Sequence, residues 1–369
     1  MANEYLHPSD VRKAHVLTRL IEKRVEEPTV YDVGFAPLYP TMQRKVKVNV
    51  REFDPVGLAQ FKADNASTPI VKGGGEVEER YMELVEICEK HVLSATDLIA
   101  LESPDVSVAE GVARDVVKLG AQLRQRNIQR TKWMSYMAAR DGLTITYPDG
   151  AGITIDFDLD GDGVNSDFSG SHLPNYGDIG DGYAWNHQDA TGDYDADILE
   201  AMHTWTMLIE NDLGIDSGEC IMHMNKATWR YCKKNAGIKA ELSAQNPRII
   251  TPRMPEVVEI LEIAEIKVIN DYYKLETSDT TKYRYIPDGY VLITAPYTVN
   301  NVPIMEMYDG PVVMAQNGRL VVNRNPGATA EIYFFEEQKA ENIRVSTARL
   351  PVMNYPAGFV YAQVYGDLD

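Results

Sequence analysis

"SVAEGVARDVVKLGAQLRQRNIQRTKWMSYMAARDG" spans residues 107–142 and carries the strongest local signal in the chain. Ser107 and Glu110 have the spacing of a capping box, in which each side chain accepts a hydrogen bond from the other residue's backbone N–H. Gly142 supplies a stop signal. Between these limits apolar residues recur at helical spacing: Val108, Val112, Val116, Leu119, Leu123, Trp133, Met134 and Met137. The pattern predicts one helix over residues 107–141, roughly 50 Å long at about 1.5 Å per residue. We interpret it as a spine along an elongated body or a rod that faces a partner.

The residues before this helix predict a shorter helix, an extended arm and a long excursion. Residues 9–25 place apolar side chains on one helical face, with Ser9 as the N-cap. A proline-rich arm follows up to residue 44, and the alternation in KVKVNV (Lys45–Val50) predicts a strand with one solvent-facing side. We interpret residues 51–100 as a two-stranded excursion with a flexible tip formed by Lys72, Gly73, Gly74, Gly75 and Glu76. A phosphate-cradling loop at KGGGE is disfavoured, because no Lys-Ser/Thr pair or helix signature follows it.

The residues after the long helix mix helices and strands. Two strands joined by PDGAG are expected within residues 143–160, followed by a long irregular loop. An acid-capped helix over 195–211 should end at Gly214, and a helix beginning after Asn225 should end at Gly237. The pattern predicts strands at ECIMHM, EIKVIN and YVLITAP. It also predicts a helix at MPEVVEILEIA, directly before the strand EIKVIN. The alternation predicts a compact α/β unit within residues 193–296 and an α+β chain overall.

The negative charge of the chain is concentrated in one segment. Residues 141–225 contain no Lys or Arg but hold 18 of the 55 acidic residues, so most of the net charge of −19 lies there. DFDLDGDGVNSD, at residues 156–167, resembles a calcium-binding loop, with these candidate ligands: Asp156, Asp158, Asp160, Asp162 and Asp167. Neither possible register of the calcium loop is complete. The alternative is the solvent-facing side of a strand, because apolar residues alternate with Asp156, Asp158 and Asp160.

The remaining composition indicates an acidic, soluble protein made in a reducing compartment. The chain has three widely spaced cysteines, which we interpret as buried or surface thiols: Cys88, Cys220 and Cys232. Arg230 and Lys233 would lower the pKa of the Cys232 thiol if they lay close to it. The start of the chain lacks the pattern of a secretion signal, and no stretch is apolar enough to span a membrane. A pI near 4.8 argues against a basic nucleic-acid-binding face.

Catalytic motifs are not apparent in the sequence, and we expect no enzyme. We found no nucleophile elbow, P-loop, dinucleotide fingerprint or HExxH zinc motif. His203 and His223 have no ligand-spaced partner and read as packing or surface residues. Two alternatives remain besides a structural role. One is a secreted or surface calcium-binding module, and the other is a hydrolase whose acidic residues bind a divalent metal.

The order of the segments resembles the major capsid protein E family of tailed bacteriophages, which includes the lambda-type shell protein. The resemblance covers nearly the whole chain and rests on these stretches: VLTRLIEKRVEEPTVYDVGFAPLYP, KVKVNV, PIVKGGGEVEERYMELVEICEKHVL, the helix 107–141, DGLTITYPDGAGITIDFDL, the lone Trp185 before DADILEAMHTW, IMHMNKATWRYCKKN and KYRYIPDGYVLITAP. The acidic loop 156–197 is where the chain departs most from the family.

The resemblance implies the Hong-Kong-97-type capsid fold, divided as follows: an N-terminal arm at 1–44, an E-loop at 45–100 whose tip lies over a neighbouring subunit, a P-domain at 101–192 with the spine helix 107–141, the hairpin and the acidic loop, an A-domain at 193–330, and a return to P-domain strands at 331–369. It also implies self-assembly as pentamers and hexamers into an icosahedral head shell around packaged double-stranded DNA, without sequence-specific DNA binding. The implied partners are further copies of the chain, a portal, a scaffolding protein and often a decoration protein. No membrane and no cofactor are implied, with Ca²⁺ as the one candidate ion. The implied location is the virion capsid, after synthesis in the host cytoplasm.

Overall fold

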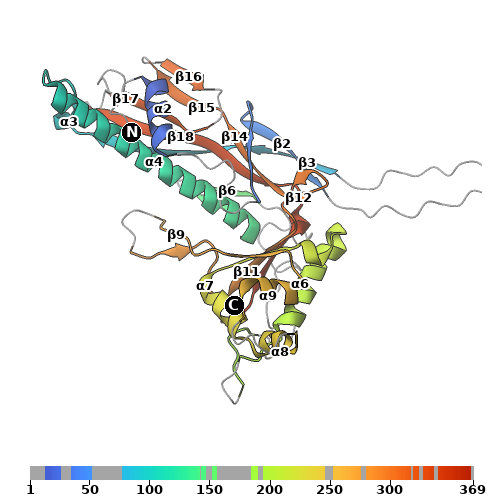
Figure 1. Cartoon of the computed structure of the whole chain (residues 1–369). Coiled ribbons are helices and arrows are strands. Elements are labelled where there is room, and N and C mark those ends of the chain that lie inside the picture. Colours follow the sequence, from blue (N-terminus) through green and yellow to red (C-terminus); the bar gives the residue numbers. More distant parts are fainter. Residues whose placement is uncertain are drawn as a thin grey trace, which may run out of the picture. The chain divides into compact units, whose positions relative to one another are not determined.

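In a computed structural model (Figure 1) the chain forms two compact units. The first unit comprises residues 1–48, 81–135 and 306–352, and the second comprises residues 49–80, 136–305 and 353–369. The structure describes residues 13–25, 35–51, 77–141, 143–146, 152–155, 184–189, 194–245, 252–275, 280–316, 319–323, 327–335 and 340–366.

The first unit is built on a five-stranded sheet. Its described elements are the helices α2 (Ala14–Arg24), α3 (Ala95–Leu101) and α4 (Val106–Asp141) and the strands β1 (Leu38–Pro40), β4 (Val85–Leu93), β14 (Met305–Gly310), β15 (Val312–Gln316), β16 (Arg319–Asn323), β17 (Thr329–Phe335) and β18 (Ala340–Met353). The sheet runs β1-β14-β18-β17, and β4 pairs with β18 as well. Residues 341–346 of β18 are therefore paired with β4 along one edge and with β17 along the other, antiparallel in both cases.

The long helix predicted over residues 107–141 is confirmed as α4, which spans Val106–Asp141 and runs alongside β18 (Figure 1). The predicted capping box is wrong. The carboxylate of Asp105 accepts hydrogen bonds from the backbone N–H and the hydroxyl of Ser107, at 2.9 and 2.7 Å, while Glu110 pairs with Arg114. Asp105 lies just outside the helix, so its carboxylate caps free N–H groups at the positive end of the helix dipole.

α4, α2 and α3 bury their apolar faces against the sheet. The shared core comprises Leu17, Ile21, Leu93, Leu101, Ala113, Val116, Val117, Leu123, Ala328, Ala330, Ile343 and Val345. Gly120 of α4 allows the close approach of α2, because a Cβ there would lie 2.3 Å from Cδ1 of Ile21. The predicted helix at residues 9–25 is observed as α2, with Lys13 at its N-cap and no capping side chain; Ser9 lies outside the described residues.

The predicted excursion is two-stranded at its base, where β2 (Lys45–Arg51) pairs with β3 (Val77–Glu83). The rest of the range expected for the excursion, up to residue 100, contains β4 and most of α3. β4 belongs to the sheet of the first unit, and α3 begins with a true capping box formed by Ser94 and Asp97. The sequence SATD at residues 94–97 carries that signal, with Asp in place of the usual Glu or Gln.

The second unit is a four-stranded sheet with helices packed on it. The sheet runs β19-β11-β7-β8, from β19 (Phe359–Gln363), β11 (Tyr290–Thr294), β7 (Ile221–Met224) and β8 (Glu265–Val268). β11 is antiparallel to both neighbours, and β7 is parallel to β8. The helices are α6 (Ile198–Leu213), α7 (Lys226–Lys234), α8 (Ala236–Gln245) and α9 (Met254–Ile260), with the short 3₁₀ turns η1 (Ser217–Glu219) and η3 (Pro356–Gly358).

Four small strand pairs complete the described elements. β5 (Leu143–Thr146) and β6 (Gly152–Ile155) form the predicted hairpin, which is antiparallel. The others are β9 (Tyr272–Tyr273) with β10 (Tyr283–Arg284), β12 (Thr298–Val299) with β13 (Val302–Pro303), and β15 with β16 in the first unit.

Helix ends in the second unit follow local capping chemistry. Gly214 ends α6 in the left-handed conformation, at φ 62°, as expected. Asn225 caps α7 as expected, but the helix ends at Lys234 rather than at Gly237. The reason is Asn235, whose side chain accepts a hydrogen bond from the backbone N–H of Ile238 and so starts α8. The sequence signal of Asn235 as an N-cap is the feature that the prediction missed.

The C-terminal residues do not stay in one unit. Residues 306–352 belong to the first unit and residues 353–369 to the second, because β18 lies in one sheet and β19 in the other. The expected A-domain end at residue 330 and the expected return of 331–369 to P-domain strands stay predictions, because compact units need not coincide with the domains of the family fold. Strands that meet in one sheet from distant parts of the sequence carry no local signal of their partners.

Candidate functional site: the anchors on strand β18

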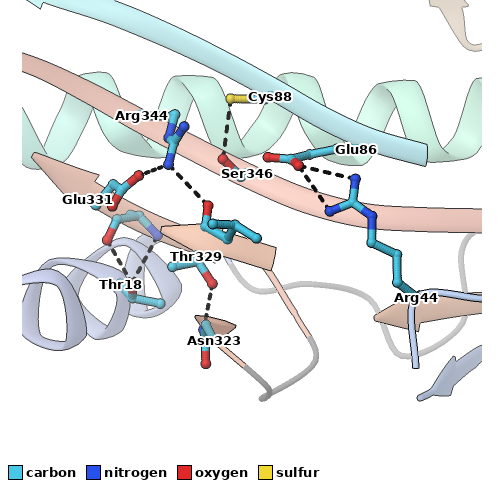
Figure 2. A network of polar contacts seen from close by, with 11 residues as sticks. Thr18, Arg44, Glu86, Cys88, Asn323, Thr329, Glu331, Arg344 and Ser346 are labelled. Atoms are coloured by element: carbon cyan, nitrogen blue, oxygen red, sulfur yellow. Dashed lines mark hydrogen bonds and ion pairs between the residues drawn. The ribbon is translucent and has the colours of Figure 1, made fainter. Parts of the chain in front are cut away.

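β18 is the point at which segments far apart in the sequence are fixed to the first unit. Figure 2 shows the polar side chains around it, from α2, the residues before β2, β4, β16, β17 and β18 itself. The strand is buried along most of its length, and its fully buried members are Asn342, Ile343, Val345, Ala348, Arg349, Leu350, Val352 and Met353. Polar groups at such a place must find protein partners, because leaving them unpaired costs about 1–3 kcal/mol each.

Arg344 joins three strands. Its guanidinium forms an ion pair with Glu331 of β17 and donates to the backbone carbonyl of Val313 in β15 at 3.1 Å (Figure 2). Burial alone would lower the pKa of Arg344, but the Glu331 carboxylate more than offsets that effect, so the pKa is raised. The guanidinium therefore stays charged and holds the β15–β16 hairpin to the sheet.

Thr18 anchors α2 to the edge of the same sheet. Its hydroxyl donates to the carbonyl of Ala330 at 3.2 Å and accepts from the N–H of Ala330 at 3.0 Å (Figure 2). Both backbone groups of one residue of β17 are thus satisfied by one side chain, 312 residues away in the sequence. The position of α2 along β17 is therefore fixed by these two hydrogen bonds as well as by apolar contacts.

Thr18→Val is expected to lower the free energy of unfolding of the first unit by about 1–2 kcal/mol, because the backbone groups of Ala330 lose both bonds to this side chain while the shape is kept. The local effect should be faster tryptic cleavage at Lys23 and Arg24 in the last turn of α2. Thr18→Ser, which retains the hydroxyl, is the matched control. Equal cleavage rates for wild type, Thr18→Val and Thr18→Ser would show that the hydroxyl does not hold α2.

Arg44 fixes the base of the excursion. Its guanidinium lies 3.4 Å from Glu86 of β4 and 3.7 Å from Glu83, and its backbone carbonyl accepts from the N–H of Leu84 at 2.9 Å. The segment that enters the excursion and the segment that leaves it are therefore connected at its base, next to the sheet (Figure 2). The ion pairs are partly exposed, so each contributes less than about 1 kcal/mol to stability. The position of the two segments therefore depends mainly on the backbone hydrogen bond between Arg44 and Leu84.

Among the described residues of the first unit, Arg349 forms the most buried ionic contact. Its guanidinium is fully buried and lies 3.3 and 3.4 Å from the two carboxylate oxygens of Asp309 in β14, and 3.2 Å from the hydroxyl of Thr131 in α4. One side chain thereby connects β18, β14 and the long helix. Sequence reasoning missed it, although an Arg inside the apolar run ARLPVM is an available signal.

The cysteines are free and act as structural side chains. All three are unpaired by disulfides, as expected. The hydroxyl of Ser346 lies 3.3 Å from Cys88, whose pKa is raised by burial. The suggestion that Arg230 and Lys233 lower the pKa of Cys232 is wrong, because burial raises it to about 12. None of these thiols is poised as a nucleophile.

His223 lies within the sheet of the second unit and is fully buried, so its interpretation as a packing residue is confirmed. Its Nε2 lies 3.4 Å from the hydroxyl of Tyr297, which accepts a hydrogen bond from Nζ of Lys267 at 2.7 Å. Burial, with a smaller effect from the charge of Lys267, lowers the pKa of His223 to about 3. The imidazole is therefore neutral throughout the physiological range.

This burial predicts acid sensitivity of the second unit. In the unfolded chain His223 binds a proton below about pH 6.5, whereas the folded chain does not, so stability is full above that pH and falls as the pH drops towards about 3. We expect a loss of roughly 2–3 kcal/mol between about pH 6.5 and 4.5, measured by urea unfolding. His223→Gln should show a smaller loss over the same range. An identical pH dependence in both proteins would contradict the assignment.

The residues predicted as specific sites, Lys72–Glu76 and Asp156–Asp167, lie outside the described residues. Within the described ranges, no three His, Cys, Asp or Glu side chains are grouped so that they could hold a metal ion. None of the described helices has the length and apolar character needed to cross a membrane.

Comparisons with known proteins identify the family. The sequence model described as "Phage major capsid protein E" matches residues 13–364. No curated protein sequence matches the chain. A prophage protein of Escherichia coli CFT073, named there as a capsid protein, has a similar structure, with a TM-score of 0.54, 12% identity and coverage of 95% of this chain and 99% of the other. A phage-related protein of Bordetella bronchiseptica RB50 is similar with a TM-score of 0.51, 12% identity and coverage of 95% and 96%.

The fold and the family agree. The two solved structures are similar to this one over nearly the whole of each chain, which establishes the fold at this low identity. The family match includes both units and every anchor on β18. The chain has the Hong-Kong-97-type capsid fold, and it belongs to the phage major capsid protein E family, whose members form the capsid shell.

Proposed function

We propose that copies of this chain assemble as pentamers and hexamers that close an icosahedral head shell around packaged double-stranded DNA. The observation that carries the proposal is the family match over residues 13–364, which leaves only short ends of the chain outside it. The anchors on β18 support it: they attach α2, β15–β16 and the base of the excursion to one sheet. Segments that contact neighbouring subunits need such fixed attachment points.

The net charge of −19 fits a container. A protein that neutralises many phosphates binds DNA tightly, and this would oppose the passage of DNA into and out of the shell. We assign the N-terminal arm to residues 1–44, the E-loop to 45–100, the P-domain to 101–192 with the later strands, and the A-domain to about 193–330. The observed units suggest moving the A-domain end towards residue 305.

The family resemblance extends the proposal to partners and location. A portal, a scaffolding protein and a decoration protein are the proposed partners, with synthesis in the host cytoplasm and the virion capsid as the final location. Co-purification of tagged full-length chain from infected cells, followed by mass spectrometry of the particle fraction, would identify such partners. Recovery of the chain only in a particle-free fraction would contradict the location.

Negative-stain electron microscopy of the full chain, expressed with its scaffolding protein, tests the main proposal. Closed shells of uniform size, with five- and six-fold units visible in class averages, are the expected result. A chain that stays monomeric under these conditions, although correctly folded by circular dichroism, would overturn the assembly proposal.

Deletion of Lys72–Glu76 tests the proposed role of the E-loop tip. The deletion ends just before β3 begins at Val77 and removes neither Arg44 nor Glu86, so the anchors at the base are kept and the subunit should remain folded. We expect the number of closed shells to fall at least about tenfold, which corresponds to a lost contact worth about 1.4 kcal/mol per subunit. Replacement of the same five residues by GSGSG is the control for length. Normal shells from the deletion would remove the E-loop assignment.

A further inference from the structure

Helices α2 and α4 of the first unit are basic, although the chain as a whole is acidic. Residues 13–24, which include α2, and residues 106–141, which form α4, hold 11 Lys or Arg residues against four acidic residues. Their net charge of +7 leaves −26 for the rest of the chain, whose total is −19. From Lys118 to Arg140, α4 contains six Lys or Arg residues and no acidic residue. The low overall pI therefore conceals one basic part of the fold.

The solvent-facing side of α4 carries a single stripe of polar side chains. Over residues 118–130 the exposed positions recur at helical spacing, and every one is a cation or an amide: Lys118, Gln122, Gln125, Arg126, Gln129 and Arg130. The positions between them turn towards the sheet, where Asn127 donates to the carbonyl of Val345 in β18 at 3.3 Å. At about 1.5 Å per residue the stripe is roughly 18 Å long. It presents a continuous row of side chains that can donate hydrogen bonds.

α2 extends this surface beside α4. Ile21 of α2 packs on Gly120 of α4, and both helices bury their apolar sides on the same face of the sheet. The helices are therefore neighbours, and α2 adds three exposed cations next to the stripe. We define the basic surface as the exposed cations of both helices: Arg19, Lys23, Arg24, Lys118, Arg126 and Arg130.

Three acidic residues reduce the charge of the basic surface without cancelling it. Arg126 forms an ion pair with Glu89 of β4 at 2.9 Å. Glu22 of α2 lies 3.6 Å from the buried guanidinium of Arg124, which it partly neutralises. Asp115 is the third acid and lies one turn before the stripe. Six exposed cations thus face three acids.

Half of these cations have no acid bound to them. Within the described part of the chain, no ion pair includes Arg19, Arg24 or Lys118. The acidic residues of α3 and of the turn after it lie at the N-terminal end of α4 (Figure 1). Asp105 is about 20 Å from Lys118 along the helix axis, whereas charges in physiological salt are screened beyond about 8 Å. The positive potential of the basic surface therefore persists.

The chemistry of this surface fits phosphate groups better than a protein partner. Among the described residues of α2 and α4, the exposed large apolar side chains are Val106 and Val108, both before the stripe. The centre of a protein interface is enriched in aromatic residues and depleted in charge, whereas interfaces with nucleic acid are polar and positively charged. Lys, Arg and Gln side chains are common donors to phosphate oxygens. The composition of the basic surface therefore favours nucleic acid.

We propose that the basic surface of α2 and α4 contacts the phosphate backbone of the packaged double-stranded DNA. This inference rests on the shell proposed above, which supplies the DNA, and it adds the side of the subunit that faces the DNA. The contact reads no base sequence, because phosphates carry none. An acidic segment of the scaffolding protein is the competing occupant.

The contact of one subunit should be weak and strongly dependent on salt. Each cation that neutralises a phosphate releases counterions, so the logarithm of the affinity falls with the logarithm of the salt concentration by about 0.9 per cation. The three cations outside ion pairs give a slope of about −2.7, which is an affinity about 20-fold lower in 150 mM than in 50 mM NaCl. Such a contact lets DNA move, in agreement with the negative charge of the rest of the chain.

Binding of duplex DNA to the full chain, before the scaffolding protein is added, tests the contact. Fluorescence anisotropy of a labelled duplex of about 30 base pairs should give the slope above for wild type, and a slope near zero for R19Q/R24Q/K118Q. The variant should also bind at least about tenfold more weakly in 50 mM NaCl. The three side chains are exposed, so the midpoint of thermal unfolding should stay within about 2 °C of wild type.

K226Q/R230Q/K282Q is the matched control, because it removes three exposed cations from the second unit. It should keep the wild-type affinity and slope. Two duplexes of unrelated sequence should bind wild type equally, to within about twofold, since the contact involves phosphates. Electron microscopy of R19Q/R24Q/K118Q expressed with the scaffolding protein should show shells in wild-type numbers.

The outcomes separate this contact from the shell proposal. No duplex binding by wild type, an unchanged slope in R19Q/R24Q/K118Q, or an equal loss in K226Q/R230Q/K282Q would overturn the DNA contact and leave the shell proposal standing. A folded R19Q/R24Q/K118Q chain that no longer forms shells would also overturn it, because the basic surface would then serve the scaffolding protein. A wild-type chain that forms no shells would overturn the shell proposal and, with it, packaged DNA as the partner.

Discussion

Asp309→Asn is expected to lower the free energy of unfolding of the first unit by about 3–5 kcal/mol, the cost of breaking a buried ion pair from one side. The substitution keeps the shape of the side chain but removes the charge that faces the fully buried guanidinium of Arg349. Arg349 cannot lose its proton to escape the cost, because the guanidinium pKa is above about 12. The midpoint of thermal unfolding should fall by roughly 10 °C.

Two further variants make this result specific. Glu110→Gln breaks the exposed ion pair with Arg114 on α4 and should change stability by less than about 0.5 kcal/mol. The double change Asp309→Leu with Arg349→Met replaces the pair by apolar groups and should recover most of the loss, because no buried charge remains. Urea unfolding followed by far-ultraviolet circular dichroism measures all three. A loss in Asp309→Asn no larger than in Glu110→Gln would contradict the role of this pair.

Trp205→Ala is expected to destabilise the second unit by about 3–5 kcal/mol, the usual cost of removing a large buried ring. Trp205 is fully buried on α6 and stacks on Trp185, which is also fully buried, with ring centroids 6.4 Å apart. The backbone N–H of Trp185 donates to the carbonyl of Val364 at 2.8 Å. Loss of the ring therefore leaves a cavity that also loosens the segment after β19.

Met207→Ala is the matched control on the same helix, because Met207 faces outward and should cost less than about 0.5 kcal/mol. Hydrogen exchange of the second unit is the measurement, and the amides of residues 359–364 should exchange faster in Trp205→Ala than in Met207→Ala. Equal exchange in the two variants would show that the Trp185–Trp205 stack does not hold the C-terminal segment.

The anchors suggest why such variants matter for a shell protein. Thr18, Arg44, Arg344 and Arg349 each join a separate part of the first unit to one sheet. A segment that must contact a neighbouring copy transmits force to its own subunit through these points. We therefore expect Asp309→Asn to reduce shell yield even at temperatures where the subunit remains folded.

Local signals predicted the elements well. The spacing of apolar residues from Val108 to Met137 determined α4 to within one residue, because a helix of this length repeats its signal many times. Gly214 and Asn225 marked helix ends correctly through backbone conformation and side-chain capping. The errors at Ser107 and Gly237 arose where a neighbouring residue, Asp105 or Asn235, offered the better cap. Competing caps one or two residues apart differ by only a few tenths of a kcal/mol, which sequence patterns do not resolve.

By itself, the sequence determined the long helix, the hairpin at residues 143–155, the α/β character of the second unit and the order of segments that matches the capsid family. The tertiary structure decided which distant residues meet: Arg349 with Asp309, Thr18 with Ala330, and Trp205 with Trp185. It also decided that β18 and β19 belong to different sheets. Helical periodicity and capping depend on residues within four positions of one another, whereas sheet partners and buried ion pairs depend on groups separated by up to 312 positions.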